Sequence, residues 1–457
     1  MKKWLLLLVL LTLTACGGTT DETNDYEVYE PEIQKPTEPA PEPTEPRQIA
    51  SPPKQDFSAD AARLVAIVEE THPIFILPHL LPDYYQTRRD QFLVATQEPM
   101  TRPDFALAVL RYYTALHDGH MSWGIQNIGG GIISDGGYLA VPFTYVYGGL
   151  FLTNYPYAEI IYIDGVPASH IIGQVDYHIF FENEFTRNLR LPYHASSGLI
   201  LRRAGVLVDA VGAAPARSPV YLTLPEGQIQ SHFTLHSPNI TQRSHGYIIR
   251  YEMMDDVLFI SLRAFVIGPH ITEVANAIRD AIDNGVTRFV VDLRGNGGGY
   301  STAGGELLYA MGMTLPTFGS VIRASDLAVA RLSQFGIHFE EGADRLESLP
   351  NPEAASNPNN ISLAILTDYY SFSSATMMAA WVQDGNLGVV VGEPSSNSPS
   401  AFGNMMFYRL TTARFELALS NTRWLRPDAD ADQNVLWPDI PVPAADALTA
   451  ALEHLRP

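Results

Sequence analysis

The chain is short of two reactive side chains, cysteine and lysine. Cys16 is the only cysteine among 457 residues, so the chain forms no internal disulfide and has no cysteine nucleophile in its globular part. The last lysine is Lys54, so no lysine in the remainder of the chain can serve as a general base. Positive charge is also scarce. With 29 Lys and Arg against 50 Asp and Glu, the net charge of −21 disfavours nucleic acids and anionic lipid surfaces as partners.

In other respects the amino-acid composition is that of an ordinary globular protein. Hydrophobic residues make up 46% of the chain and charged residues 17%, which is typical of a soluble protein with a substantial core. The length predicts two or three domains.

The amino terminus has the pattern of a signal peptide. Lys2 and Lys3 precede an apolar run that is too short to span a bilayer and ends in Leu13-Thr14-Ala15-Cys16. Residues 1–16 resemble a bacterial lipoprotein signal peptide, which implies a lipid-anchored, extracytoplasmic protein of the bacterial cell envelope, attached to the membrane through lipidated Cys16. The alternative is an ordinary secretory signal with an incidental cysteine. Residues 17–55, rich in Pro, Glu and Thr, predict a disordered acidic linker.

Residues 56–125 predict a small helical subdomain. Apolar residues recur there at helical spacing, and prolines punctuate the pattern. The stretch ends in LHDGHM, which contains His120. On its own, a histidine just past a helix end is most simply a capping or surface residue.

Two further units follow. Residues 138–240 contain short apolar or alternating runs separated by turn signals and predict a β-rich module. The run IIYIDGVPASHII within it looks like part of a PDZ-like domain, and the alternative is a structural module without a binding groove. Residues 246–457 alternate strands with helices, which predicts an α/β domain with parallel strands and right-handed crossovers.

The most informative stretch of the α/β domain is RFVVDLRGNGGGY, residues 288–300. Its apolar run suits a strand buried on both faces, and Gly297, Gly298 and Gly299 allow close approach of the backbone to another group. The turn could form an anion cradle, an oxyanion hole or merely tight packing. It is neither a P-loop nor a dinucleotide fingerprint, because both the Lys-Ser/Thr pair and the G-x-G-x-x-G pattern are absent.

A second strand-to-helix turn carries serines. Parallel sheets place their sites at the carboxyl ends of strands, so this turn and the glycine turn are expected at one edge. A serine there can act as a nucleophile, because the N–H groups at a helix start can bind an oxyanion. Ser371, Ser373 and Ser374 could each instead be a helix cap.

The order of these motifs resembles the tail-specific, or carboxyl-terminal-processing, serine peptidase family. The matching pieces are FVVDLRGNGGG, then SFSSATMMAAWVQD, then VVVGEP. The resemblance implies an α/β catalytic domain with crotonase-like ββα repeats, preceded by the PDZ-like module and the helical subdomain. It also implies that Ser374 is the nucleophile and that N–H groups of Ala375 and of Gly297 or Gly298 form the oxyanion hole.

The chain departs from the best-known members in one respect. They carry a lysine base shortly after G-E-P, and here Ser395-Ser396-Asn397-Ser398 offers none. The chain therefore resembles a second branch of the family, similar to the tricorn core protease, in which a histidine of the helical subdomain is the base. That resemblance implies His120 as base and Asp432 as the acid, although the tricorn-like enzyme has glutamate at the latter position.

The implied activity is hydrolysis of peptide bonds by a Ser-His-acid mechanism on a peptide or protein substrate. No cofactor or metal is implied, because the sequence contains neither H-E-x-x-H nor a Cys/His cluster. Two alternatives remain open: a ligand-binding lipoprotein on the same scaffold, with little or no catalysis, and an esterase-like hydrolase that acts on small acyl substrates.

Overall fold

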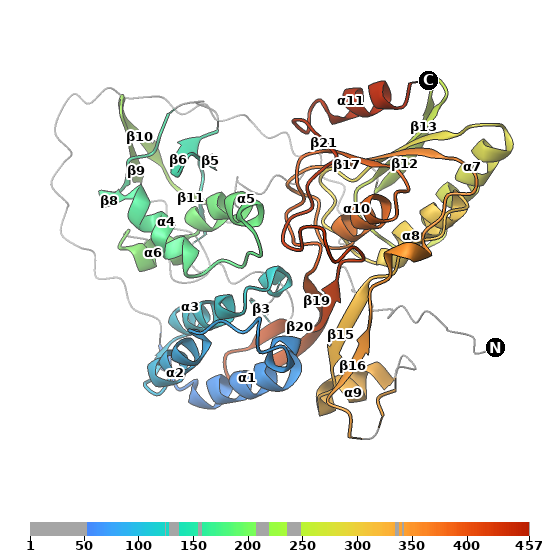
Figure 1. Cartoon of the computed structure of the whole chain (residues 1–457). Coiled ribbons are helices and arrows are strands. Elements are labelled where there is room, and N and C mark those ends of the chain that lie inside the picture. The colour runs from blue at the N-terminus through green and yellow to red at the C-terminus, as the bar shows by residue number, and fades with distance from the viewer. Residues whose placement is uncertain are drawn as a thin grey trace.

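The computed structural model describes residues 53–123, 125–127, 137–153, 158–206, 219–234, 248–333, 338–340 and 342–456. The predicted signal peptide, residues 1–16, and the linker up to residue 52 lie outside this range. Within the range, no helix is both long enough and apolar enough to cross a membrane. Three units can be followed in Figure 1: helices at the amino-terminal end, a middle α+β unit, and a carboxy-terminal α/β unit.

The amino-terminal unit is helical, as the apolar spacing predicts. It consists of α1 (Ser58–Thr71), α2 (Tyr85–Ala95) and α3 (Arg102–Tyr113), followed by the 3-10 helices η2 (Thr114–Leu116) and η3 (Gly119–Trp123). Thr101 caps α3 by accepting the N–H of Asp104 at 3.2 Å. A short strand pair, β1 (Lys54–Gln55) with β2 (Met100–Thr101), ties the last residues of the predicted linker to this unit.

The middle unit combines a small antiparallel sheet with helices. The sheet has the order β10-β9-β7-β8, and a separate hairpin is formed by β5 and β6. The strands are β5 (Phe143–Val146), β6 (Gly149–Leu152), β7 (Tyr162–Ile163), β8 (Val166–Pro167), β9 (Val220–Leu224) and β10 (Gly227–Ser231), and the helices are α4 (Ala168–Asp176), α5 (Glu184–Ala195) and α6 (Gly198–Ala204). The resemblance of this unit to a PDZ-like domain stays a prediction.

The carboxy-terminal unit is built on a six-stranded sheet of order β12-β13-β14-β17-β18-β21. Only β12 is antiparallel to its neighbour; the other pairs are parallel, as predicted. The elements are β12 (Ile249–Met254), β13 (Val257–Leu262), α7 (Pro269–Asp283), β14 (Arg288–Asp292), α8 (Ser301–Ala310), β17 (Ser362–Thr367), α10 (Ser374–Asp384), β18 (Val389–Gly392), β21 (Ile440–Pro441) and α11 (Ala447–His454).

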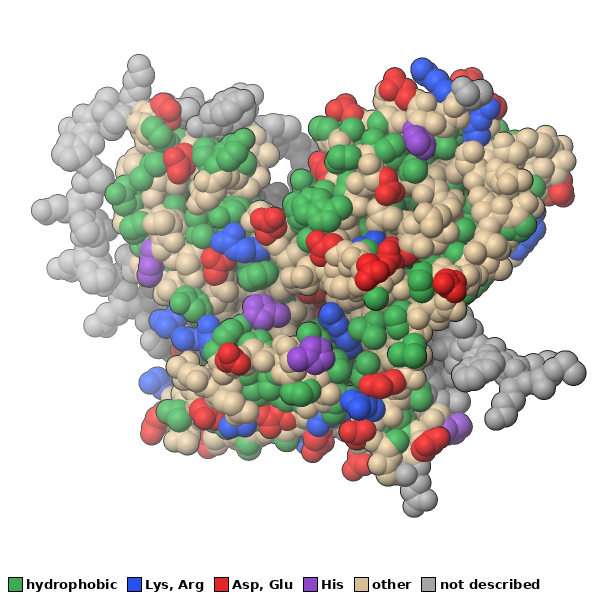
Figure 2. All heavy atoms as spheres, in the orientation of Figure 1, with side chains coloured by type: hydrophobic (Ala, Val, Ile, Leu, Met, Phe, Trp, Pro, Cys, Tyr) green, Lys and Arg blue, Asp and Glu red, His purple; other side chains and the backbone are tan. Residues whose placement is uncertain are grey.

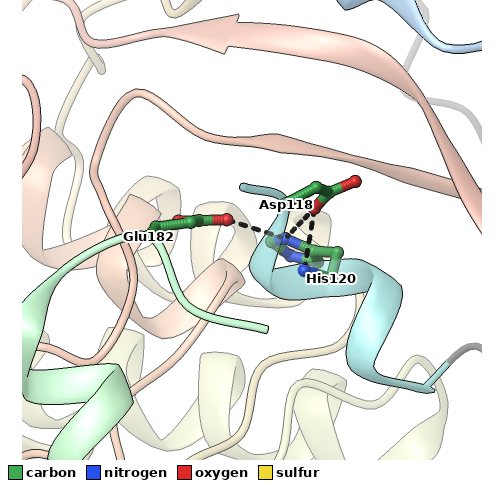
Figure 3. Close-up of side chains that lie close together, drawn as sticks. All are labelled: Asp118, His120 and Glu182. Carbon is green, nitrogen blue, oxygen red and sulfur yellow. Dashed lines mark hydrogen bonds and ion pairs between the residues drawn. The ribbon is translucent and has the colours of Figure 1, made fainter. Parts of the chain in front are cut away.

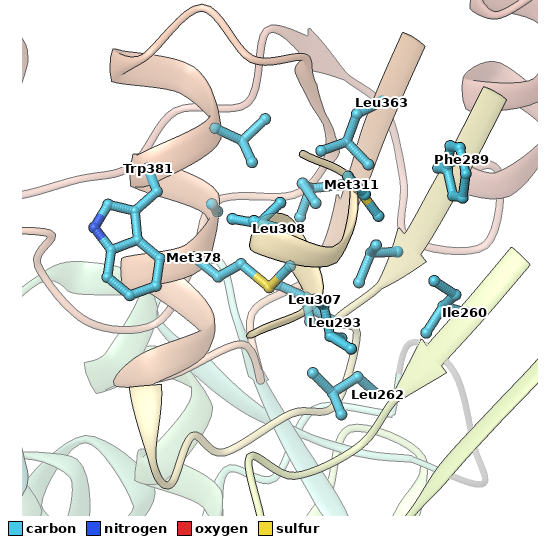
Figure 4. Close-up of a cluster of buried hydrophobic side chains, with 14 of the residues drawn as sticks. Ile260, Leu262, Phe289, Leu293, Leu307, Leu308, Met311, Leu363, Met378 and Trp381 are labelled. Atoms are coloured by element: carbon cyan, nitrogen blue, oxygen red, sulfur yellow. The ribbon is translucent and has the colours of Figure 1, made fainter. Parts of the chain in front are cut away.

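Helices cover both faces of this sheet, so the central strands are apolar on both sides. Side chains of α8 and α10 pack with Phe289 and Val291 on one face (Figure 4). On the other face, Val290 packs with residues of α11. The apolar run of β14 therefore reflects burial on both faces, as the sequence predicts.

A second sheet joins the carboxy-terminal unit to the helices. Its main order is β16-β15-β20-β19, from β15 (Gly319–Arg323), β16 (Arg345–Ser348), β19 (Phe402–Leu410) and β20 (Phe415–Leu425), and β3 (Ile125–Asn127) pairs with β20. Apolar side chains of the long β19–β20 hairpin belong to the same buried cluster as α1 and α3. The hairpin thus holds the end of the helical unit near the main sheet (Figure 1).

Acidic side chains lie on both the upper and the lower parts of the face shown in Figure 2. Their number agrees with the net charge of −21, and they form no single acidic surface on that face.

Candidate active site

Two strand-to-helix turns meet at the carboxyl ends of the adjacent parallel strands β14 and β17. The backbone N–H of Phe372 donates to the carbonyl of Asn296 at 2.9 Å, which joins the turns directly. Gly298 has φ +99, and a Cβ placed on it would lie 2.6 Å from Cβ of Ser373 and 2.8 Å from the carbonyl oxygen of Phe372. Glycine is therefore required where the two turns touch.

Ser373 stands immediately before α10 in a rarely populated backbone conformation. Its φ of 58 and ψ of −117 resemble those of a nucleophile elbow, where a serine is lifted at a sharp turn between a strand and a helix. The N–H of Ser373 donates to Oδ1 of Asn397 at 2.7 Å. Oγ of Ser373 lies 3.0 Å from Nε2 of His120, within hydrogen-bonding distance.

Ser374, which the sequence predicts as the nucleophile, is not brought to His120. Its hydroxyl donates to the carbonyl of Gly299 at 2.7 Å. As the first residue of α10, Ser374 turns its side chain back to the glycine turn, whereas the residue before the helix faces the histidine. The neighbouring serine thus occupies the position that the motif assigned to Ser374.

The predicted oxyanion-hole residues lie at this junction, but two of their N–H groups are already paired. Gly298 donates to Oδ1 of Asn296 at 2.8 Å, and Ala375 donates to the carbonyl of Phe372 at 3.1 Å. In the described part of the chain, neither the N–H of Gly297 nor that of Ser374 forms a hydrogen bond. These two N–H groups are available to an oxyanion, and the start of α10 adds its favourable dipole.

His120, the predicted base, lies on η3 at the end of the helical unit. Its side chain is 11% exposed, and its ring centre lies 4.7 Å from that of Phe372. Nδ1, on the side away from Ser373, is buried and has no hydrogen-bond partner among the described residues. The carboxylate oxygens that face Nδ1 are Oε1 of Glu182 at 3.7 Å and Oδ1 of Asp118 at 4.0 Å (Figure 3).

Asp118 is fixed by two histidines. Its Oδ1 accepts the backbone N–H of His120 at 2.8 Å, and its Oδ2 lies 3.3 Å from Nε2 of His72. Nδ1 of His72 accepts the N–H of Ile74 at 3.2 Å, so Nε2 carries the proton and donates to Asp118. Burial acts to raise the pKa of Asp118, but the hydrogen bond from His72 and the nearby imidazoles outweigh it, and this pKa falls below the ordinary aspartate value.

Glu182 reaches the site from the middle unit, in the segment between α4 and α5. Its Oε1 accepts the N–H of Gly119 at 3.0 Å, and its Oε2 accepts the N–H of Ser398 at 2.9 Å. A Cβ at position 119 would lie 2.9 Å from Oε1, so a glycine leaves room for this carboxylate. Sequence reasoning missed Glu182, because a lone acidic residue in another unit carries no motif.

The structure does not bring Asp432, the predicted acid, to His120. Asp432 lies in the loop that leads to β21, and its Oδ1 accepts the N–H groups of Asn434 and Val435. Its Oδ2 accepts Nε1–H of Trp437 at 3.1 Å. Its carboxylate is thus satisfied within its own loop, and no ion pair among the described residues joins it to His120.

Asp118, His120 and Glu182 could offer one ligand atom each to a metal ion, since these atoms lie within 4.8 Å of one another. The other nitrogen of His120 faces a serine hydroxyl, and both oxygens of Glu182 accept backbone N–H groups. These contacts suit a proton-transfer site, in which the imidazole takes a proton from the serine.

Comparison with known proteins finds one family model that matches part of the chain. Residues 256–442 match the model for peptidase family S41. None of the curated proteins matches the chain. Among solved structures, mature CPAF complexed with lactacystin matches with a TM-score of 0.58 at 13% identity, over 88% of this chain and 96% of that chain.

Mature CPAF alone matches with a TM-score of 0.57 at 13% identity, over 87% of this chain and 95% of that chain. A photosystem II D1 C-terminal processing protease matches with a TM-score of 0.42 at 14% identity, over 85% of this chain and 94% of that chain. The likeness to the two CPAF structures extends the shared fold beyond residues 256–442. Residues 256–442 of the chain are thus similar to peptidase family S41, and this match supports a serine-type peptidase.

Proposed function

We propose that the chain hydrolyses peptide bonds with Ser373 as nucleophile and His120 as general base. The observation that carries this proposal is the 3.0 Å distance between Oγ of Ser373 and Nε2 of His120, with Ser373 in an elbow conformation at the start of α10. Ser373 replaces Ser374 in this assignment, because the hydroxyl of Ser374 is committed to the carbonyl of Gly299.

In the first half of the reaction, Oγ of Ser373 attacks the carbonyl carbon of the substrate while Nε2 of His120 takes the hydroxyl proton. The N–H groups of Ser374 and Gly297 stabilise the negative oxygen of the tetrahedral intermediate. Collapse of this intermediate breaks the C–N bond, and His120 returns its proton to the departing amine. The product is an acyl ester on Ser373.

In the second half, a water molecule attacks the ester carbonyl and gives its proton to His120. The same two N–H groups stabilise the second oxyanion. The C–O bond to Ser373 then breaks, the serine recovers the proton from His120, and the new carboxyl end of the peptide leaves. No lysine is needed in either half, in agreement with the absence of lysine after Lys54.

We also propose that the protein works outside the cytoplasm, held to the membrane of a bacterial cell envelope by a lipid on Cys16. The support is the sequence alone: a basic start, a short apolar run, and Leu13-Thr14-Ala15 directly before the cysteine. The acidic linker up to residue 55 would then hold the peptidase away from the membrane surface.

Two serine variants test the assignment of the nucleophile. Ser373→Ala is expected to reduce peptide hydrolysis by about 10⁶-fold, as does loss of a triad serine elsewhere, with little change in thermal unfolding. Ser374→Ala removes one hydrogen bond of about 1 kcal/mol but retains the backbone N–H, and is expected to keep hydrolysis within about tenfold. If Ser373→Ala hydrolyses as well as the unmodified protein, the proposal is wrong. An unmodified protein that hydrolyses no peptide would instead favour the ligand-binding alternative.

A further inference from the structure

We propose that Glu182 is the positioning carboxylate of the active site. In this proposal it orients the ring of His120 and stabilises the imidazolium that forms when Ser373 attacks. The inference rests on the proposed function of Ser373 and His120. It assigns the third role of the site to the middle unit, in place of the carboxy-terminal loop that contains Asp432.

The proton on the neutral ring of His120 needs an acceptor. For Nε2 to accept the hydroxyl proton of Ser373, the neutral ring must carry its own proton on Nδ1. Nδ1 is buried and has no hydrogen-bond acceptor among the described residues. A buried N–H group without an acceptor is unfavourable, and the group becomes a full positive charge during catalysis. An acceptor must therefore close on Nδ1 from one of the two carboxylates that face it.

Glu182 is better placed than Asp118 to accept this proton. Oε1 of Glu182 is the nearer, at 3.7 Å, against 4.0 Å for Oδ1 of Asp118. Both oxygens of each carboxylate already accept a donor, but Asp118 also binds a second histidine, His72, whereas Glu182 accepts only backbone N–H groups. Oε1 of Glu182 accepts one N–H group, from Gly119, and keeps a lone pair for a second donor.

Charged side chains surround the ring of His120. Asp118 and Glu182 face it from η3 and from the α4–α5 segment, and both carboxylates interact electrostatically with Arg190 of α5 and Arg423 of β20. His72, which donates to Asp118, and Tyr113, which interacts electrostatically with Asp118, are further titratable groups of this cluster. The positive charges of the two arginines balance the negative charges of the two carboxylates. When His120 gains a proton, its new positive charge is stabilised most by the nearer carboxylate, Glu182.

The segment that carries Glu182 is anchored to both of the other units. Nδ2 of Asn183 donates to the carbonyl of Asn434 at 3.1 Å, and Phe185 stacks on Tyr369 with ring centres 5.4 Å apart. Arg190 donates to the carbonyls of Gly119, at 3.1 Å, and Phe180, at 2.7 Å. The position of Glu182 therefore depends on docking of the middle unit against the other two.

The test is the rate at which a fluorophosphonate modifies Ser373 in the full chain, measured from about pH 5 to 9. Glu182→Gln is expected to lower the maximal rate at least tenfold, toward the roughly 10⁴-fold loss known for neutralised triad carboxylates. The half-saturating probe concentration should stay the same. The pH of half-maximal rate should fall, because loss of the negative charge makes protonation of the neighbouring imidazole less favourable.

Glu184→Gln is the matched control, because it makes the same change two residues away on an exposed side chain. It should match the unmodified protein in rate and pH profile. A merely structural role for Glu182 would lower the rate without moving the pH of half-maximal rate. Should Glu182→Gln fail to fold, Glu182→Asp keeps the charge but withdraws it by one methylene, and a smaller shift in the same direction is expected.

The proposal is overturned if Glu182→Gln, or Glu182→Asp in its place, reacts with the rate and pH profile of the unmodified protein. It is equally overturned if the rate falls while the pH of half-maximal rate stays fixed. If the unmodified protein does not react at Ser373, the proposed function fails and this inference fails with it. Reaction of the unmodified protein and of Glu182→Gln alike leaves the function standing and removes only the role of Glu182.

Discussion

Individual residues determine which of two adjacent serines faces His120. The sequence SFSSA offers several hydroxyl groups, and no periodicity tells which of them precedes the first helical residue. In the structure, Ser373 is the residue before the helix and has φ 58. Ser374, one position later, directs its hydroxyl to the carbonyl of Gly299 in the glycine turn. His120 could be predicted from its motif. Glu182 could not, because its relation to His120 exists only after three units have packed together.

Gly298 lies where the two turns touch, and the space there does not accommodate a larger side chain. Gly298→Ala would place a methyl group 2.6 Å from Cβ of Ser373, on a backbone with φ +99. We expect unfolding to become easier by about 1–3 kcal/mol and peptide hydrolysis to be lost, because the elbow must move. Urea denaturation and a hydrolysis assay measure the two effects.

Gly173→Ala, on α4, is the control for this substitution. Nothing lies within 4 Å of a Cβ there, and alanine favours a helix over glycine, so stability should rise slightly. A Gly298→Ala protein as stable and as active as the unmodified one would contradict the close contact between the two turns.

At the scale of elements, the apolar patterns predicted the main sheet well. The apolar runs at 257–262 and 362–367 coincide with β13 and β17, because short apolar runs in a covered parallel sheet end where burial ends. Residues 316–360, which are rich in Pro, Gly, Ser and Asn near their end, show no clear strand pattern, yet they contain β15 and β16. All four residues of β16 are exposed, so the strand leaves no apolar pattern and is held by pairing with β15.

The end of α4 carries a pH-sensitive residue. His178 is buried, and burial lowers its pKa to about 4, assisted by Arg111, Arg203 and Arg88 and opposed by a hydrogen bond to the carbonyl of Gln174. The unfolded chain binds this proton near pH 6.5, whereas the folded chain binds it only near pH 4. The stability contributed by burying neutral His178 is therefore complete above about pH 6.5. It is lost as the pH falls toward 4, because the unfolded chain then binds the proton more readily.

We expect His178 to account for a loss of about 2 kcal/mol in the free energy of unfolding between pH 7 and 5. His178→Asn keeps a side-chain N–H donor without a titrating group, and its stability should fall less over the same range. Urea denaturation at the two pH values measures the difference. Equal losses in both proteins would show that His178 is protonated in the folded state at pH 5.

At the scale of the whole molecule, the proposed active site draws residues from all three units. His120 comes from the helical unit, Glu182 from the middle unit and Ser373 from the carboxy-terminal unit. The sequence predicted a meeting of the first and last, because motif order placed the base and the nucleophile in different units. The contribution of the middle unit could not be predicted, since it depends on long-range contacts such as that of Glu182 with the N–H of Ser398.

The proposed lipid anchor at Cys16 determines where the whole protein is found in the cell. Cys16→Ser removes the only cysteine, so incorporation of labelled fatty acid in a bacterial host should stop, and the protein should leave the membrane fraction. The catalytic residues are untouched, so the released protein should still hydrolyse peptides. Continued fatty-acid labelling of the Cys16→Ser protein would exclude this cysteine as the lipid site.

The central claim is that Ser373, activated by His120, is the nucleophile. The most direct test is to react the purified protein with a fluorophosphonate and to locate the modified residue by mass spectrometry, with His120→Ala as the control that lacks the base. We predict a single adduct on Ser373 and at most trace labelling of the His120→Ala protein. An adduct on Ser374 or on another residue, or equal labelling without His120, would contradict the account.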